Sequence, residues 1–229
     1  MHDESPRVVR ATRPPWNSAD WAALVESGVR RSYTSGQRIL RQGDEGNWVA
    51  ALIAGRAKVL YAGRGGEEIL LAVRGPGDLL GEFAQADRRP RSASVEAMER
   101  CIISLVTDIR FADWLTKRRL SAKLDQYVLA KARENADLTW QLTRYRPAKR
   151  LAALLLTVIA AGSDRHPAPL TVPMPQDDLA QAIGLARSSI TPILADWKRR
   201  GLVTIERSHM TVCDVAALRR LHQTSRDAM

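Results

Sequence analysis

Residues 176–195 read QDDLAQAIGLARSSITPILA, a pattern typical of two short helices joined by a tight turn. Leu179 and Ile183 are four residues apart and therefore fall on one helical face. Ala180 is small where two helices would cross, and Gly184 permits the positive φ that a tight turn requires. Further apolar residues complete a small core: Leu185, Ile190, Ile193 and Leu194. The stretch therefore predicts a helix-turn-helix.

The second of these helices is expected to present polar side chains near its N-terminus, the part of a recognition helix that enters the DNA major groove. These residues are Arg187, Ser188, Ser189 and Thr191. We expect Arg187 and Ser188 to read bases, since arginine bonds guanine bidentately, and Gln176 and Ser189 to hold phosphates. A helical hairpin with the same packing and no DNA contact is the alternative, which the outward polar residues and basic surroundings disfavour.

A wing is predicted after the second helix. Three basic residues (198–200) precede Gly201, which is expected to end the helix. Residues 202–205 and 209–212 then have the pattern of two short strands. We expect Pro192 within or just beyond the first helical turn, or at a bend, because a proline deeper in a helix removes a hydrogen bond.

The charge balance favours a polyanionic partner. Lys and Arg number 35 against 25 Asp and Glu, which gives a net charge of +10. Residues 141–229 carry 13 basic and 7 acidic residues, so +6 of that excess accompanies the helix-turn-helix. We therefore expect double-stranded DNA as a partner. A basic surface that serves only solubility is the alternative.

The N-terminal half has a different sequence pattern. Short β-prone segments alternate with glycine turns, which predicts an antiparallel β-roll. The expected strands are 37–40, 48–53, 57–61, 68–73, 92–96 and 101–106. The predicted fold class is thus α+β. It has four parts: an N-terminal arm with a short helix (1–30), the β-roll (31–108), a dimerisation helix with a hinge (109–145) and a winged helix-turn-helix (146–229).

Residues 111–145 contain no Gly or Pro and predict a long helix, followed by another helix that starts at Pro147 and runs to residue 161. Six positions repeat at spacings of 4, 3, 4, 3 and 4: Leu124, Val128, Lys131, Asn135, Leu138 and Leu142. Such a repeat is typical of a helix that packs against a partner helix, with polar residues that fix the pairing. We expect a homodimer through residues 120–142. The alternative is a helix that lies on its own barrel, with Lys131 and Asn135 at the solvent edge.

Residues 75–95, GPGDLLGEFAQADRRPRSASV, combine groups that suit a sugar phosphate. Gly81 leaves neighbouring backbone N–H groups open to an anion. Glu82 can accept hydrogen bonds from a pair of hydroxyls, and Arg91 with Ser92 offers a fork of donors to a phosphate. An ion pair between Glu82 and Arg91 that binds nothing is the alternative.

The order of these parts resembles that of the CRP/FNR family of bacterial transcription regulators over nearly the whole chain. The segments GEFA (81–84) and PRSA (90–93) are similar to the family's phosphate-binding cassette. The resemblance implies that Glu82 holds a ribose 2′-hydroxyl, that Arg91 neutralises a cyclic phosphate and that Asn135, with Lys131, lies near the base. The implied ligand-binding residues are Gly81, Glu82, Phe83, Ala84, Arg91, Ser92 and Asn135.

The resemblance further implies an allosteric regulator with cyclic AMP as effector, no cofactor, and RNA polymerase as a protein partner. The alternative is a DNA-binding regulator of the same fold that does not respond to a cyclic nucleotide. Gln85 and Ala86 stand where the family usually has a bulky apolar pair, which puts the coupling to ligand in question. Ser188 and Pro192 depart from the family's common recognition helix and imply a different DNA target.

The sequence lacks the residues that several other classes of function require. The arm has no cysteine cluster for an iron–sulfur centre, and the roll has no histidine for a haem or a cupin-type metal site. No nucleophile–base pair or P-loop is found, so we predict no enzyme activity. Cys101 and Cys213 suit a reducing cytoplasm. Residues 1–21 lack the apolar core of a secretory signal, and the longest apolar run, 151–161, is too short to span a membrane.

Overall fold

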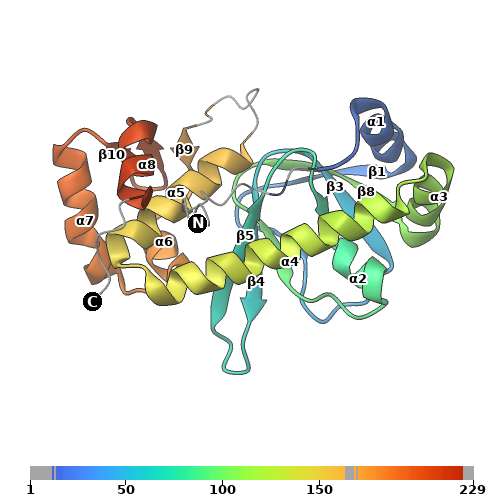
Figure 1. Ribbon diagram of the computed structural model, residues 1–229, viewed down its shortest axis with the longest axis horizontal. Helices are drawn as coiled ribbons and strands as arrows, with labels where there is room; N and C mark the ends of the chain where they lie inside the picture. The colour runs from blue at the N-terminus through green and yellow to red at the C-terminus, as the bar shows by residue number, and fades with distance from the viewer. Residues whose placement is uncertain (1–11, 13, 163–167, 169, 224–229) are drawn as a thin grey trace, which may run out of the picture. The chain divides into compact units, whose positions relative to one another are not determined.

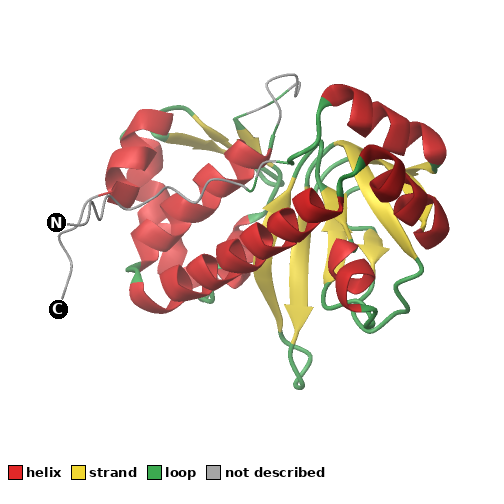
Figure 2. Cartoon of the chain, turned by 45° about the vertical axis from the view of Figure 1, so that its right-hand side comes forward, coloured by secondary structure: helices red, strands yellow, loops and turns green. Residues whose placement is uncertain are grey.

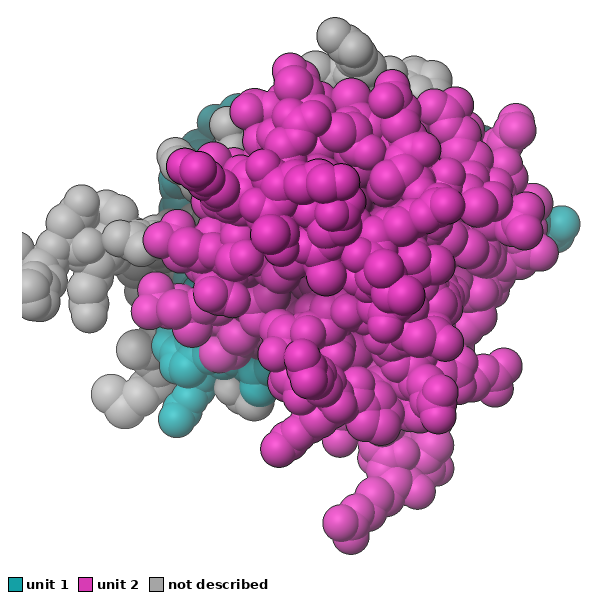
Figure 3. Space-filling model, turned by 90° about the vertical axis from the view of Figure 1, so that its right-hand side faces the viewer, with its two compact units in different colours: residues 1–10, 137–229 teal, residues 11–136 magenta. Residues whose placement is uncertain are grey.

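The computed structural model of the protein describes residues 12, 14–162, 168 and 170–223, with the side chains of 142 and 143 left out. The chain divides into two compact units. The first unit, magenta in Figure 3, spans residues 11–136, and the second unit, teal in Figure 3, comprises residues 1–10 and 137–229.

The first unit is a roll of two antiparallel sheets flanked by helices (Figures 1 and 2). One sheet has the strand order β1-β8-β3-β6 and the other has the order β2-β7-β4-β5. The strands are β1 (Val29–Tyr33), β2 (Arg38–Leu40), β3 (Trp48–Ala54), β4 (Ala57–Ala62), β5 (Glu68–Arg74), β6 (Leu79–Leu80), β7 (Ser94–Ala97) and β8 (Cys101–Thr107). The helices are α1 (Ser18–Ser27), α2 (Glu82–Asp87), α3 (Asp108–Arg118) and α4 (Ser121–Arg144), which continues into the second unit.

The position of strand β3 between two cores explains why its sequence is apolar throughout. Ala50 and Leu52 join the core between the two sheets, together with Ile103 of β8. Val49 and Ala51 point to the opposite face and join a second core with α1, α3 and α4. A strand buried on both faces needs apolar side chains at every position, not at alternate ones. The six strands predicted from the sequence are confirmed, whereas β1 and the two-residue β6 were not predicted.

The second unit contains the predicted winged helix-turn-helix. Its elements after α4 are α5 (Pro147–Ala161), β9 (Thr171–Val172), α6 (Gln176–Ala182), α7 (Arg187–Arg199), β10 (Val203–Ile205), β11 (Met210–Val212) and α8 (Val215–Gln223). The wing strands form a sheet of order β10-β11-β9, in which β9 is an unpredicted third strand. Pro147 occupies the first turn of α5, as predicted. Over the residues that the structure describes, no helix is both long and apolar enough to cross a membrane.

The single long helix predicted over 111–145 is wrong: two helices cover this segment. Arg119 ends α3 with a left-handed backbone, φ 54°. Its N–H donates to the Thr116 carbonyl, and the Leu120 N–H donates to the Leu115 carbonyl. Two carbonyls in the last turn of α3 thus gain hydrogen-bond partners. Leu120 is thereby buried in the core with α1 and α3. Burial of a leucine contributes about 1.5–3 kcal/mol, enough to offset the cost of about 1–2 kcal/mol for a left-handed arginine.

The predicted partner-facing repeat on α4 is also wrong in part. Leu124 is 6% exposed and packs in the core of its own unit beside Tyr127. Lys131 is 2% exposed and contacts residues of its own roll, so it lies neither at a solvent edge nor on a face left open for a partner. The buried positions 124, 127, 131 and 134 define the face of α4 that covers the roll. Leu129 is 52% exposed on the remaining surface of the helix.

Candidate functional site

A glycine turn positions the first candidate site. Gly81 lies between β6 and α2 with φ at 85°, a backbone conformation that glycine adopts without strain. A Cβ at this position would also displace the guanidinium of Arg91, because it would overlap the Nη1 atom. The turn therefore brings the start of α2 against the guanidinium of Arg91, ten residues further along the chain.

The predicted ligand residues gather around one cavity of the first unit. Together with the open solvent at its mouth, the cavity has a volume of about 550 Å³. All seven residues line it: Gly81, Glu82, Phe83, Ala84, Arg91, Ser92 and Asn135. They come from the turn before α2, from α2 itself, from the loop after it and from α4. A floor of apolar side chains completes the cavity: Leu40, Val59, Leu71, Leu79, Leu80 and Val95.

Arg91 is held by the protein's own backbone. Its Nη1 donates to the Gly81 carbonyl at 2.7 Å, and its Nη2 donates to the Trp48 carbonyl. The guanidinium also lies 5.0 Å from the centre of the Trp48 ring. Burial lowers the pKa of Arg91, while the carboxylates of Glu82 and Asp44 act in the opposite direction. The arginine remains a cation at neutral pH and lines the cavity.

Glu82, which the sequence assigns to a ribose, is paired with Lys131. The Nζ of Lys131 donates to Glu82 Oε1 at 2.6 Å and to the Leu79 carbonyl at 2.7 Å. Both side chains are nearly inaccessible, 3% and 2% exposed. Burial lowers the pKa of Lys131, and the Glu82 carboxylate opposes that effect. Glu82 Oε2 has no such bond to Lys131 and is the oxygen left to accept from a ligand hydroxyl.

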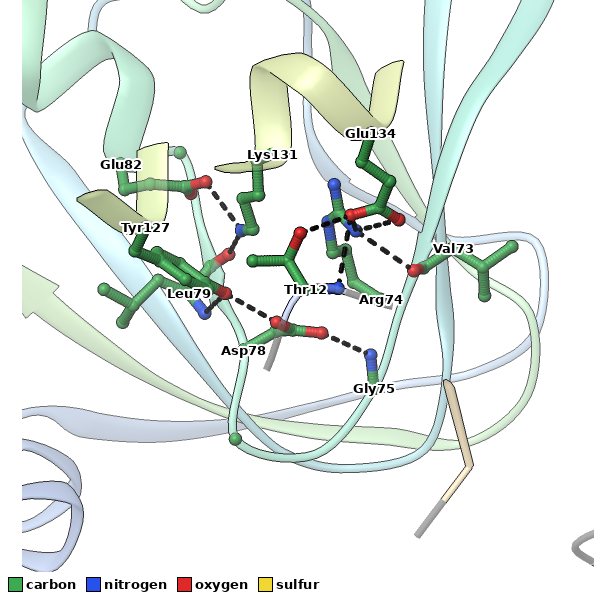
Figure 4. Close-up of polar contacts among 12 residues, drawn as sticks. Thr12, Val73, Arg74, Gly75, Asp78, Leu79, Glu82, Tyr127, Lys131 and Glu134 are labelled. Atoms are coloured by element: carbon green, nitrogen blue, oxygen red, sulfur yellow. Dashed lines mark hydrogen bonds and ion pairs between the residues drawn. The ribbon is translucent and has the colours of Figure 1, made fainter. Parts of the chain in front are cut away.

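Next to this pair lies a network of buried charges, shown in Figure 4. Arg74 Nη1 donates to both oxygens of Glu134 at 2.9 Å, and the Thr12 hydroxyl donates to Glu134 Oε2 at 2.8 Å. The Tyr127 hydroxyl donates to Asp78 Oδ1 at 2.5 Å. Burial raises the pKa values of Asp78 and Tyr127. The network ties α4 to the end of β5 and to the turn before β6 without leaving these charges unpaired.

Sequence reasoning missed Arg74, Asp78, Tyr127 and Glu134 as neighbours of the site. Glu134 and Lys131 are three apart, which also fits a solvated helix surface. Arg74 gave the one usable signal, since it is a charged residue that ends the apolar segment 69–73 directly before a glycine turn.

The second candidate site is the exposed surface of the helix-turn-helix. Gly184 has a φ of 68° in the turn, as predicted. Beneath the two helices lie Leu179, Ile183, Ile190 and Leu194, all nearly inaccessible, with Leu185 and Ile193 half-buried at the margin. Trp197 completes this core and was not predicted.

All the predicted DNA-contacting residues of α7 are exposed: Arg187, Ser188, Ser189 and Thr191. Gln176, at the start of α6, is half-buried. Arg187 donates to Asp177 Oδ2 at 2.9 Å, and the Thr191 hydroxyl donates to the Arg187 carbonyl. Pro192 lies inside α7, which nevertheless continues to Arg199.

Comparison with known protein families assigns both units. The model of the cyclic nucleotide-binding domain matches residues 30–118, and that of the Crp-like helix-turn-helix domain matches residues 149–221. The chain is 26% identical over 205 residues to the "CRP-like cAMP-activated global transcriptional regulator" of Mycobacterium tuberculosis, which covers 87% of this chain and 90% of that protein. It is 28% identical over 190 residues to the "Cyclic AMP receptor protein" of Thermus thermophilus, which covers 82% and 86%.

Solved structures share the fold at lower identity. FixK2 from Bradyrhizobium japonicum has a TM-score of 0.72 at 17% identity, with 86% of this chain and 98% of that chain covered. A CRP-family transcriptional regulator from Thermus thermophilus has a TM-score of 0.69 at 22% identity, with 87% and 100% covered.

Proposed function

Because the chain belongs to the CRP/FNR family of transcription regulators, we propose that it acts as a homodimer that binds palindromic DNA under the control of a cyclic nucleotide. The proposal keeps the cytoplasmic location and the contact with RNA polymerase that the sequence implies. Each half has its own support in the described residues.

The proposed binding of a cyclic nucleotide rests on the cavity that the predicted ligand residues line together. Seven residues predicted from the sequence, from the turn before α2 to α4, line a single hollow. Arg91 and the N–H groups after Gly81 would hold the cyclic phosphate, and Glu82 would accept from the ribose. Because Asn135 and Lys131 belong to α4, a ligand that contacts them acts directly on this helix, which continues into the second unit.

The DNA half rests on the exposed polar start of α7. Arg187 and Ser188 would read base edges in the major groove, and Gln176 and Ser189 would hold phosphates. In a homodimer, two such helices enter successive major grooves about 34 Å apart. The exposed side chains of Leu129 and Trp140 on α4 support dimerisation through that helix, on a different face from the one predicted.

Calorimetric titration tests the ligand half. We expect saturable binding of a cyclic nucleotide in the micromolar range, roughly −8 kcal/mol. Arg91→Ala should abolish it, because the phosphate loses its main cation. Arg89→Ala is the matched control, since Arg89 is exposed two residues away and does not line the cavity. Loss of binding in both variants would contradict the assignment of Arg91.

Selection of DNA from a random pool tests the other half. We expect enrichment of an imperfect palindrome. Ser188→Ala should change the preferred bases, whereas Lys198→Ala should weaken binding to all sequences alike. Equal loss in the two variants would contradict base reading by Ser188.

One observation favours a second candidate, a regulator of the same fold that binds DNA without a cyclic nucleotide. Arg91 already bonds two carbonyls, and Glu82 already bonds Lys131, so a ligand must compete with contacts inside the chain. In that case the Arg91→Ala protein would bind the selected DNA as tightly as the unaltered protein, with or without nucleotide.

A further inference from the structure

The cavity is cationic at the end that α4 closes. Glu82, Lys131 and Arg74 lie in a row in Figure 4, from the start of α2 to the end of β5. All three line the cavity, together with Asn135 one helical turn beyond Lys131. If the phosphate lies on Arg91 and the ribose on Glu82, the base is the part of the ligand that reaches Lys131 and Arg74.

Arg74 has donors that the protein does not use. The residue is 3% exposed, and only its Nη1 donates, to Glu134 and to the Val73 carbonyl. Among the described residues, neither Nε nor Nη2 of Arg74 has a hydrogen-bond partner. A guanidinium cannot lose its protons, and Arg74 lines the cavity, so these N–H groups are available to an acceptor of a ligand bound there.

Nucleobases differ at this point. Guanine presents two neighbouring acceptors, O6 and N7, which match the fork of an arginine. Adenine replaces O6 with an amino group, whose N–H would face the N–H groups of Arg74 and the charge of Lys131. Donors that face donors are unfavourable, because the N–H groups of Arg74 then have no acceptor in the complex.

We propose that this cavity selects a cyclic nucleotide with a 6-oxopurine base, whose O6 and N7 atoms accept hydrogen bonds from Arg74. This selection rests on the proposed function and concerns the same cavity. It departs from cyclic AMP, the effector predicted from the sequence. Arg74 is thereby the specificity-determining residue, and Glu134 and Thr12 position it.

Three ligands separate the contributions in calorimetric titrations of the full chain. Cyclic GMP and cyclic IMP share O6 and N7, and cyclic IMP lacks the 2-amino group of guanine. Cyclic AMP differs from cyclic IMP only at position 6 and the adjoining N1 proton. We expect the two 6-oxopurines to bind at least about tenfold more tightly than cyclic AMP, as a bidentate arginine–guanine pair allows.

A double variant tests the role of Arg74 without leaving a buried charge unpaired. Arg74→Met with Glu134→Gln removes both charges and keeps an acceptor for Thr12. We expect it to bind cyclic AMP at least as tightly as the unaltered protein, because the unfavourable donors are gone, and to lose the preference for the 6-oxopurines. Arg64→Met, an exposed residue in the turn between β4 and β5, is the matched control and should keep the preference.

Each outcome has one meaning. Equal or tighter binding of cyclic AMP would overturn the selection and leave the proposed sensor intact. A preference for cyclic GMP that survives the double variant would overturn the role of Arg74. Absence of binding by all three nucleotides would instead contradict the proposed function.

Discussion

Two ion pairs of equal length, one in each unit, have opposite surroundings. Arg74 and Glu134 meet at 2.9 Å beside the cavity, with side chains only 4% and 5% exposed. Arg187 and Asp177 also meet at 2.9 Å on the helix-turn-helix, but their side chains are 59% and 65% exposed. Water screens the second pair, whereas burial weakens the screening of the first.

This difference separates two ways of building a recognition surface. The charges beside the cavity are locked by partners from several elements, so the cavity has its shape and its donors before a ligand arrives. The polar side chains of α7 are free to adjust when DNA approaches, because little energy holds them in place. The cavity should therefore tolerate few substitutions, and the helix surface many.

The largest effect is expected from Glu134→Ala. It leaves the Arg74 cation buried without its counter-charge, which costs about 3–5 kcal/mol of unfolding free energy. Urea unfolding followed by tryptophan emission measures this. The double variant Arg74→Met with Glu134→Ala should recover most of the loss. A cost below about 1 kcal/mol for Glu134→Ala would mean that the pair is not buried in solution.

Tyr127→Phe should have an intermediate effect. The hydroxyl that donates to Asp78 disappears, and a buried carboxylate loses a hydrogen bond, at a cost of about 1–3 kcal/mol. The same urea titration measures it. Tyr61→Phe is the matched control, because Tyr61 is 44% exposed on β4, and it should leave stability unchanged. Equal effects of the two variants would contradict the importance of the Asp78 contact.

A pH dependence is expected from His222 in the second unit. The side chain is 1% exposed, and its Nδ1 has no hydrogen-bond partner among the described residues. Burial, then the charge of Lys149, lowers the pKa of His222 below its ordinary value of 6.5. Below pH 6.5 the unfolded chain takes up the proton before the folded one, so stability falls as the pH falls towards the lowered pKa.

The slope is bounded by one proton, about 1.4 kcal/mol per pH unit. Urea titrations between pH 7.5 and 5 measure it. His222→Leu should flatten this part of the profile, since it removes the titrating group. An unchanged profile in that variant would assign the dependence to other groups.

The smallest effect is expected from Asp177→Ala. Removal of an exposed partner of Arg187 should change the unfolding free energy by at most about 1 kcal/mol. Thermal unfolding checks this value. A loss above about 2 kcal/mol would erase the contrast between the two pairs.

Local patterns predicted much of the fold for physical reasons. Gly184 and the apolar spacing of residues 179–194 specify the helix-turn-helix, because a tight turn and one buried face depend on nearby residues. The six predicted strands lie between glycine turns, which mark where pairing must stop. By contrast, Arg119 carries no signal of a helix end, since Leu120 is drawn into a core formed by residues distant in the sequence.

The candidate cavity likewise has residues that the sequence predicted and partners that it did not. Residues 81–93 revealed Glu82 and Arg91 because the spacing within one short segment is set by the chain itself. The partner of Glu82 comes from α4, about fifty residues away, and no local pattern distinguishes a lysine that faces the roll from one that faces water.

The sequence alone therefore determined the order of the β-roll and the helix-turn-helix, and it identified the candidate anion-binding segment 81–93, because these features depend on short-range spacing of glycine, apolar and charged residues. Only the tertiary structure decided which face of α4 is buried, that Glu82 pairs with Lys131, and that Arg74 keeps N–H donors without partners among the described residues beside the cavity. These features arise from contacts between distant segments, whose energies depend on burial, and burial is a property of the folded chain.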